Sequence, residues 1–403
     1  MRISTQSFYE QSQSAMNSQQ TSLLRVQQQI GAGSKILTPS DDPLGSTRAL
    51  AISQSISLNA QYSASRAAAG QTLSLEENAL QNTSEILQNI KGLVVQAGNG
   101  TLSDADRASI ATTLQSSRDQ LLGLANSDDG NGQFLFAGFK SASAPFVQQA
   151  NGSVQYAGDQ GQRLVQVDVS RQMAGSDDGR SIFQSVQGGA GYITSSNAAN
   201  AGNVTFSATS VINAANPNYG KDFTISFGGG NYTVATTDVP PVTVATAAYT
   251  SGTPIQFGGL QVTLSGVPAA GDTISVSTAK NAGTDMFASL DNIITALKTP
   301  FDNATPAARA QMLNSLSTGN VKMDNALNNV LTIRSSVGSR LQELDALKNT
   351  GDTRDLSDKS YLSDLQDLNY TSTISELYQR QTALQATQQT FVQMKKISLM
   401  NYL

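Results

Sequence analysis

The sequence contains no histidine, no cysteine and no tryptophan. Without histidine or cysteine, a chain cannot build a Ser-His-Asp or Cys-His nucleophilic site, a Cys/His zinc site or a haem ligand set. The lack of cysteine also rules out disulfides, so packing or assembly with other subunits must stabilise the chain wherever it works. Most enzyme templates are therefore excluded, and we expect no cofactor and no metal.

Positive charge and long apolar runs are also scarce. The 25 Lys and Arg residues are outnumbered by 30 Asp and Glu residues and are scattered along the chain, so we expect no nucleic-acid partner. No stretch is apolar for long enough to span a bilayer, and MRISTQSFYEQSQSAMNSQQ at the N-terminus lacks the apolar core of a cleaved secretory signal. These features fit a cytoplasmic protein or one exported by a machine that uses an uncleaved, unstructured N-terminus.

The chain of 403 residues is longer than a single core usually requires, and its hydrophobic pattern changes twice. The outer thirds space apolar residues by three and four, as helices do. The stretch 133–282 instead carries β-branched and aromatic runs separated by Gly, Asn and Pro: QFLFAGF, RLVQVDV, VTFSA, KDFTISF, NYTVA, VTVATAAY, QVTLSG and TISVST. We therefore predict an α+β fold, in which both chain ends form an antiparallel coiled-coil rod and a β-rich domain is inserted in the middle.

Each end of the chain carries half of a heptad seam. In both runs Ser or Gln occupies the intermediate positions, such as Gln381 and Gln388, and the apolar members are Tyr9, Met16, Leu23, Ile30, Ile374, Leu377, Leu384 and Phe391. One apolar residue per heptad buries too little surface to offset the entropy of ordering a helix. We expect both ends to be loose in the monomer and to pack against each other or against neighbouring copies. An ordinary intramolecular packing face is the alternative.

The inner helical segments have fuller seams. Leu73, Leu80 and Leu87 recur every seven residues, and Met323 begins a similar run in which Arg334 is the polar exception. We expect helix breaks at 99–100 and 319–320, and a capping box at 103–106. The predicted organisation is an N-terminal assembly helix, the two halves of the rod around the β-rich domain, and a C-terminal assembly helix: 1–42, 43–132, 133–282, 283–350 and 351–403.

The stretch TPSDDPLG, residues 38–45, predicts a turn between two helices. Pro39 disfavours helix at the preceding residue, Ser40 or an Asp can cap the next helix, and Pro43 suits its first turn. A metal site at Asp41 and Asp42 would need further oxygen ligands nearby, and none follow. NSDDGNGQF, residues 126–134, likewise lacks the alternating ligands of a calcium loop, so we predict a turn leading into a hairpin at 134–139.

Several segments together resemble a known family. They are MRISTQSFYEQ at the start, SDDP at 40–43, QFLFAGFKSASAPF at 133–146, RSSVGSRLQELD at 334–345, and ALQATQQTFVQMKKISLMNYL at the end. They are similar to the hook-associated protein 3 family of bacterial flagella, which belongs to the flagellin-like superfamily. The resemblance covers both helical thirds in the order that the family has them.

This resemblance implies a structural adapter that joins the hook side of a flagellum to its filament and is not an enzyme. It implies export through the flagellar type III apparatus, without a cleaved signal, to an extracellular position at the hook-filament junction. The implied partners are copies of itself in a ring, hook-associated protein 1 on the hook side, flagellin on the filament side, and an export chaperone at the C-terminal helix. Neither nucleic acid nor membrane is implied.

Other functions fit the pattern less well. A flagellin filament subunit would share the helical ends, but the ending ISLMNYL argues against it. A secreted adhesin or translocator would also combine loose ends with a β insert. A hydrolase would have to use carboxylates of the β region, where no carbohydrate-cleft aromatics surround the candidates Asp159, Asp168, Asp177 and Asp178.

Overall fold

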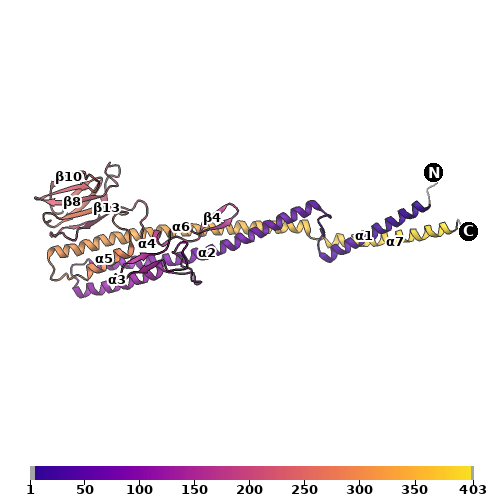
Figure 1. Ribbon diagram of the computed structural model, residues 1–403, viewed down its shortest axis with the longest axis horizontal. Coiled ribbons are helices and arrows are strands. Elements are labelled where there is room, and N and C mark those ends of the chain that lie inside the picture. The colour runs from indigo at the N-terminus through magenta and orange to yellow at the C-terminus, as the bar shows by residue number, and fades with distance from the viewer. Residues whose placement is uncertain (1–4, 401–403) are drawn as a thin grey trace. The chain divides into compact units, whose positions relative to one another are not determined.

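The computed structural model describes residues 5–400, which form two compact units. Unit 1 comprises the described residues up to Ala64 and from Ala346 onward, and unit 2 comprises Ser65–Asp345. Figure 1 shows the helices, which are α1 (Thr5–Ala32), α2 (Pro43–Ala97), α3 (Asp104–Ala125), α4 (Gly179–Phe183), α5 (Met286–Leu297), α6 (Pro306–Gln366) and α7 (Tyr370–Met400). The long helices α2 and α6 contribute residues to both units.

The strands all lie between α3 and α5, so the predicted α+β class with a β-rich middle is confirmed. They are β1 (Phe146–Gln148), β2 (Val154–Tyr156), β3 (Leu164–Asp168), β4 (Arg171–Ala174), β5 (Tyr192–Ser196), β6 (Thr205–Phe206), β7 (Ser210–Val211), β8 (Phe223–Gly228), β9 (Asn231–Thr236), β10 (Thr243–Ala248), β11 (Pro254–Phe257), β12 (Leu260–Ser265) and β13 (Thr273–Thr278). β1 pairs with β2, and β3 pairs with β4, as two small antiparallel hairpins.

Residues 192–278, which we call the β domain, form two larger antiparallel sheets. One sheet has the order β10-β9-β8-β13-β5, and the other has the order β11-β12-β6 with β7 also paired to β12. Strand β8 shows why these residues form strands: Phe223, Ile225 and Phe227 are buried, and the Thr and Ser between them point the other way. Side chains from both sheets share one hydrophobic core, so the β domain has a core of its own.

The predicted strand QFLFAGF is wrong. Residues 134–139 form turns, although Leu135 and Phe136 are buried. Gly138 has a φ of +68°, which bends the chain, and the main chain bonds to scattered partners, with the Phe134 N–H donating to the Ser141 carbonyl at 2.8 Å. Apolar side chains here fill the core of unit 2 from a loop, which the sequence pattern does not distinguish from a strand.

In unit 2, α2 and α6 lie side by side and antiparallel. Leu73, Leu80 and Leu87 are fully buried, in agreement with the predicted seam. Arg334, the polar exception, donates to Glu77 at 2.6 Å between the two helices, so its charge is neutralised by an ion pair.

The break between α2 and α3 agrees with the predicted turn at 99–100 and the predicted capping box. The Ser103 side chain accepts from the Asp106 N–H while the Asp106 carboxylate accepts from the Ser103 N–H. Behind this turn Arg107 is fully buried, where it donates to the carbonyls of Ala97 and Asn99 and lies 4.1 Å from the Phe301 ring centroid. A buried cation therefore satisfies the carbonyls that end α2.

The predicted break at 319–320 is wrong, because α6 runs through it. A Cβ at Gly319 would lie 2.4 Å from Cγ1 of Ile293 on α5. The glycine thus allows α5 to approach α6 closely and does not end the helix. α6 also runs through the expected boundary at 350/351, where the Gly351 carbonyl accepts from the Asn59 side chain at 2.7 Å. The boundary at 42/43 coincides with the start of α2.

Candidate assembly surface

The two ends of the described chain pack against each other in unit 1, where α1 lies along α7 (Figure 1). The ring centroids of Tyr9 and Phe391 are 4.9 Å apart, so the structure brings together the outermost members of the two predicted half-seams. Main-chain directions are opposite, as an antiparallel pair requires. The α1–α7 contact line is called the terminal seam below.

The terminal seam is thin. Its predicted members Met16, Leu23 and Ile30 on α1, like Leu377 and Leu384 on α7, are half-buried. Among the α1 residues whose burial the structure describes, Val26 is the most buried apolar one, with 4% of its surface exposed. Val26 stands at an intermediate heptad position where the sequence pattern suggested only Ser and Gln, and its spacing of three residues from Leu23 was the signal that could have identified it.

Ile374 does not begin the seam on α7. Its side chain is 41% exposed, and the neighbouring Thr373 takes the buried position and donates to the Asn369 carbonyl at 2.9 Å. The heptad run therefore starts one residue earlier than the apolar pattern indicated. Ile374 instead lies near the positions of Tyr370 and Tyr378 on the α7 surface, since residues four apart share a helix face.

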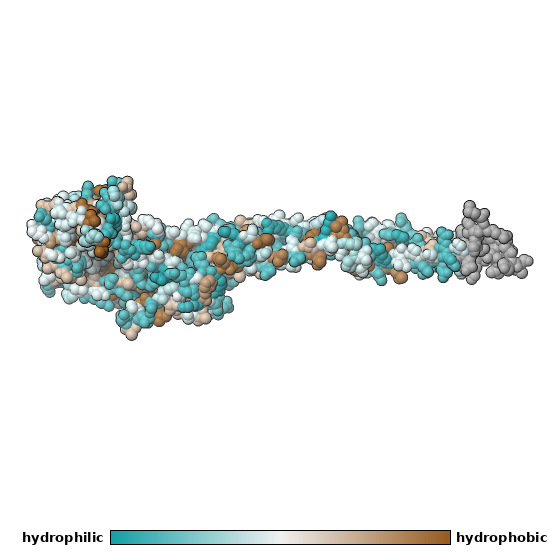
Figure 2. All heavy atoms as spheres, turned by 45° about the horizontal axis from the view of Figure 1, so that its top comes forward, coloured by the Kyte–Doolittle hydropathy of each residue, from teal (hydrophilic) through white to brown (hydrophobic). Residues whose placement is uncertain are grey.

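Few apolar side chains of unit 1 are buried. Among its described residues, the buried apolar side chains are Val26 and Ala49. Figure 2 shows apolar residues interrupting a largely hydrophilic helical surface. The large exposed ones of unit 1, which sequence reasoning largely missed, are Tyr9, Leu24, Leu44, Leu50, Leu58, Leu356, Tyr361, Tyr370, Ile374, Tyr378 and Val392. These exposed apolar side chains form the candidate assembly surface of unit 1.

The turn between α1 and α2 is held by its own side chains. Pro39 occupies the second position of a turn closed by the Asp41 N–H donating to the Thr38 carbonyl at 2.9 Å. Ser40 bonds the Thr38 hydroxyl at 2.8 Å. Asp42 accepts from the Gly45 N–H at 2.8 Å and so caps α2, of which Pro43 is the first residue.

Asp41 organises the same turn. Its carboxylate accepts from the Thr38 N–H at 3.0 Å and the Leu37 N–H at 3.1 Å, and it pairs with Arg25 of α1 at 3.0 Å. The hydrogen bond from Thr38, followed by that from Leu37 and the charge of Arg25, holds the pKa of Asp41 below its usual value. Both carboxylates of the predicted turn are thus occupied by main-chain donors.

The break between α6 and α7, residues 367–369, bonds directly to the α1–α2 turn. The Lys35 N–H donates to the Gln366 carbonyl at 2.9 Å, and the Leu368 N–H donates to the Gly33 carbonyl at 3.1 Å. Ser34 and Asp367 form an antiparallel bridge between them. The two helix breaks therefore form one joint, which fixes the register of α1 against α7.

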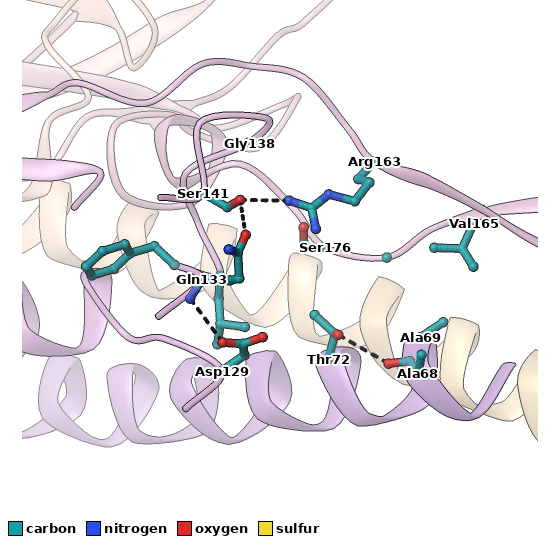
Figure 3. A pocket seen from close by; sticks show the side chains of 13 residues that line it. Ala68, Ala69, Thr72, Asp129, Gln133, Gly138, Ser141, Arg163, Val165 and Ser176 are labelled. Atoms are coloured by element: carbon teal, nitrogen blue, oxygen red, sulfur yellow. Dashed lines mark hydrogen bonds between the residues drawn. The ribbon is translucent and has the colours of Figure 1, made fainter. Parts of the chain in front are cut away.

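A small pocket in unit 2, lined by α2 and the loops around 129–141 and 163–176, does not form a reactive site (Figure 3). Arg163 donates to the Ser141 hydroxyl at 3.0 Å, Ser141 donates to the Gln133 amide oxygen, and the Gln133 N–H donates to Asp129 at 3.1 Å. Each polar group of this hydrogen-bond series stabilises the loop. Main-chain donors also lower the pKa of Asp129, as expected for a turn rather than a calcium loop.

Three of the four carboxylates considered for a hydrolase form structural hydrogen bonds or ion pairs within unit 2. Asp159 accepts from the N–H groups of Phe139 and Gly161, Asp178 caps α4, and Asp177 pairs with Arg340. Within the part of the chain that the structure describes, no group of Asp and Glu side chains is placed to hold a metal ion.

No helix between residues 5 and 400 is long and apolar enough to cross a membrane.

Comparison with known proteins agrees with this arrangement. Residues 3–141 match the bacterial flagellin N-terminal helical region. The flagellar hook-associated protein 3 of Salmonella typhimurium is 34% identical over 401 residues, which cover 99% of this chain and 98% of that protein. The chain belongs to the hook-associated protein 3 family. The Escherichia coli K12 member is 33% identical over a similar length.

Solved structures of family members share the fold. The hook-associated protein 3 of Legionella pneumophila superposes with a TM-score of 0.71 at 28% identity and covers 78% of this chain and 98% of its own. The Xanthomonas campestris FlgL structure gives a TM-score of 0.68 at 28% identity and covers 77% and 99%. A further Legionella structure is described as a flagellar junction protein. The fold of this chain is thus shared with solved structures of the family over about three quarters of its length.

Proposed function

We propose that this protein is the structural adapter of the hook-filament junction, and that its terminal helices fold as they assemble. The observation that carries the proposal is the imbalance of unit 1, where Val26 and Ala49 are the buried apolar side chains among the described residues and many large ones are exposed. Such helices gain little by packing within one molecule. They gain much more when neighbouring subunits cover them.

The energies involved favour assembly. Burying one large apolar side chain contributes about 1.5–3 kcal/mol. When a handful of such side chains is buried in each interface around a ring of copies, the ring does not dissociate once it has formed. The glutamines of the seam can bond across it without making the monomer aggregate, since they leave the exposed helix polar when it is alone.

The joint between the two helix breaks supports this role. Main-chain bonds between Lys35 and Gln366, and between Leu368 and Gly33, hold α1 and α7 in one register. Because the seam itself is thin, a register fixed at one end presents the exposed apolar residues of both helices as a single surface. Neighbouring subunits would then meet a defined surface rather than a sliding helix pair.

The partners follow from the family and from this surface. Copies of the same chain would cover the sides of unit 1 in a ring, hook-associated protein 1 would contact it on the hook side, and flagellin on the filament side. The C-terminal helix would bind an export chaperone before passage through the flagellar type III apparatus, with no cleaved signal. Its place would be extracellular, and it would have no enzymatic activity.

Deletion of the gene in its source bacterium tests the adapter role. The expected result is bare hooks on the cell surface and unpolymerised flagellin in the medium, since filament growth would lack its joint. Normal filaments would contradict the proposal and favour an adhesin or translocator. A loss of filaments without flagellin in the medium would indicate the filament subunit itself.

Complementation tests the assembly mechanism. Leu384→Asp places a charge in the half-buried terminal seam and should abolish filament formation while the β domain of the purified protein stays folded. Leu384→Met keeps an apolar side chain of similar volume and should restore filaments. Equal complementation by both variants would show that the seam does not drive assembly.

A further inference from the structure

The β domain rests on α6 through a line of polar side chains that bind its main chain. Asn314 donates to the Val204 carbonyl at 2.8 Å and accepts from the Phe206 N–H at 3.3 Å. Thr318 donates to the Thr194 carbonyl at 2.7 Å. Gln311 donates to the carbonyls of Ala198 and Asn200 at 2.7 and 3.0 Å. The three α6 residues lie three and four positions apart and so share one face of the helix.

This contact differs from the packing that holds the β domain together. Its own core joins both sheets through buried side chains such as Phe223, Val262 and Val276. The α6 contact consists instead of side-chain amides and a hydroxyl bonded to main-chain groups. Water can replace hydrogen bonds of this kind, whereas a broken hydrophobic core has no such substitute. The β domain can therefore leave α6 without unfolding.

Two open clefts border the β domain, and the first of them adjoins the contact line. One lies between β5, α5 and α6 and is lined mainly by hydroxyl and amide side chains, including Ser195, Ser289, Asn292 and Ser315. The other lies beside the linkers and α4 and includes Arg180 and Lys280. The first cleft opens to solvent beside Thr318, one of the docking residues, whereas the Asn314 bonds are buried.

Of the two linkers that join the β domain to the rest of unit 2, the first is the freer one, because Asn281 of the second donates to Asp222 of the β domain at 2.7 Å. Below them, Gln187 accepts from Thr332 of α6 at 2.8 Å, and Thr284 donates to the Gln184 carbonyl. Between these anchors and the β domain lie 188–190 and 280–283. A Cβ at Gly188 or Gly189 would meet nothing within 4 Å, and Gly189 has a φ of +87°, so this backbone is free of side-chain constraint.

We propose that the β domain is a reversibly docked module, held on α6 by Gln311, Asn314 and Thr318 and able to swing away as a rigid body about the linkers 188–190 and 280–283. The Lys322 ammonium, which donates to the Ala282 carbonyl at 2.6 Å, ties the second linker to α6 and limits how far it bends. The inference concerns the single chain and does not depend on what the protein assembles with.

Spin-label distance measurement tests the proposal. The chain has no cysteine, so Thr246→Cys on exposed β10 and Ser335→Cys on exposed α6 give two unique labelling sites. Asn314→Ala removes two docking bonds and should raise the undocked fraction about five- to tenfold, seen as a second, displaced distance. Gln311→Ala and Thr318→Val added to it should make that distance dominant. Asn328→Ala, at an exposed position of the same helix, is the matched control and should leave the parent distribution unchanged.

Hydrogen exchange on the same variants separates swinging from unfolding. The amides of β8 and β13 should keep their protection in the triple variant, because the β domain core stays intact. A single unchanged distance in the triple variant would overturn reversible docking. Loss of protection in β8 and β13 together with the new distance would also overturn it, because the β domain would then be unfolding rather than moving as a body.

Discussion

Units 1 and 2 are built from similar long helices but are stabilised in different ways. In unit 2, α2 and α6 bury leucines completely, and α3, α5 and the loop at 134–139 complete a continuous core. In unit 1 the same two helices, with α1 and α7, bury Val26 and Ala49 among the described residues and expose Leu50, Leu356 and Tyr378. The same secondary structure thus encloses a hydrophobic core in unit 2 and leaves large apolar side chains exposed in unit 1.

The largest difference should appear on truncating one leucine in each unit. Leu87→Ala in unit 2 leaves a cavity in a close-packed core and should lower the free energy of unfolding by about 2–5 kcal/mol. Leu50→Ala in unit 1 removes a side chain that is 70% exposed, so the change should be within about 0.5 kcal/mol. Denaturant unfolding of the monomer measures both. Similar losses would show that Leu50 is covered in the monomer.

Two glycines of α6 should respond in opposite directions. Gly319→Ala places a Cβ against Ile293 and should destabilise unit 2 by about 1–3 kcal/mol. Gly338→Ala, where a Cβ would meet nothing within 4 Å, should stabilise α6 by up to about 1 kcal/mol. Thermal unfolding of the two variants compares them directly. A stabilising Gly319→Ala would mean that α5 does not approach α6 as closely as described.

Unit 2 should also respond to pH through Glu76. Its carboxylate is fully buried and accepts from the Asp177 N–H at 3.2 Å. Burial, and then the charge of Asp177, raise the pKa of Glu76 well above its usual value of 4.5, while the charge of Arg340 opposes the shift. A carboxyl whose pKa is raised on folding binds its proton more tightly in the folded state. Its contribution to stability is therefore complete below about pH 4.5 and is lost as the pH rises through the folded pKa.

The measurement is the free energy of unfolding against pH for the wild type and Glu76→Gln. The wild type should lose stability relative to Glu76→Gln as the pH rises above about 4.5. Glu85→Gln on the exposed side of α2 is the matched control and should follow the wild type. Parallel wild-type and Glu76→Gln curves would show that Glu76 ionises freely in the folded protein.

The smallest effect should come from the joint of unit 1. Asp42→Ala removes the N-cap of α2 and should lower the stability of its first turn by about 1 kcal/mol. Ser40→Ala, which removes only a hydroxyl bonded to Thr38, should have a smaller effect. Hydrogen exchange at Gly45 and Ser46 measures the local loss. Unchanged exchange at Gly45 would mean that the Asp42 side chain does not cap the helix in solution.

Much of the fold follows from residue spacing and capping chemistry. The capping box at Ser103 and Asp106 and the prolines around 38–45 act over a few residues, so the sequence alone determines where those helices begin. The heptad spacing also places Tyr9 and Phe391 in the two half-seams, and the structure brings the centroids of their rings within 4.9 Å.

Other features depend on neighbours that no short stretch of sequence specifies. Gly319 is a helix breaker by propensity, but its role is set by Ile293 on a different helix. QFLFAGF has strand propensity, but its apolar side chains fill a core from a turn. The exposed Leu50 and Tyr378 look like ordinary surface residues until their shortage of partners within unit 1 is seen. Strand order in the β domain likewise depends on long-range pairing.

Hydrogen exchange of the purified monomer over the whole chain is the most direct test of the contrast between the two units. The prediction is that amides of α1 and α7 exchange fast and that the α2 and α6 amides of unit 2 are strongly protected, with α1 and α7 gaining protection when the protein assembles onto isolated hooks. Protection of α1 and α7 in the monomer equal to that of unit 2 would contradict it, because the terminal helices would then be complete without a partner.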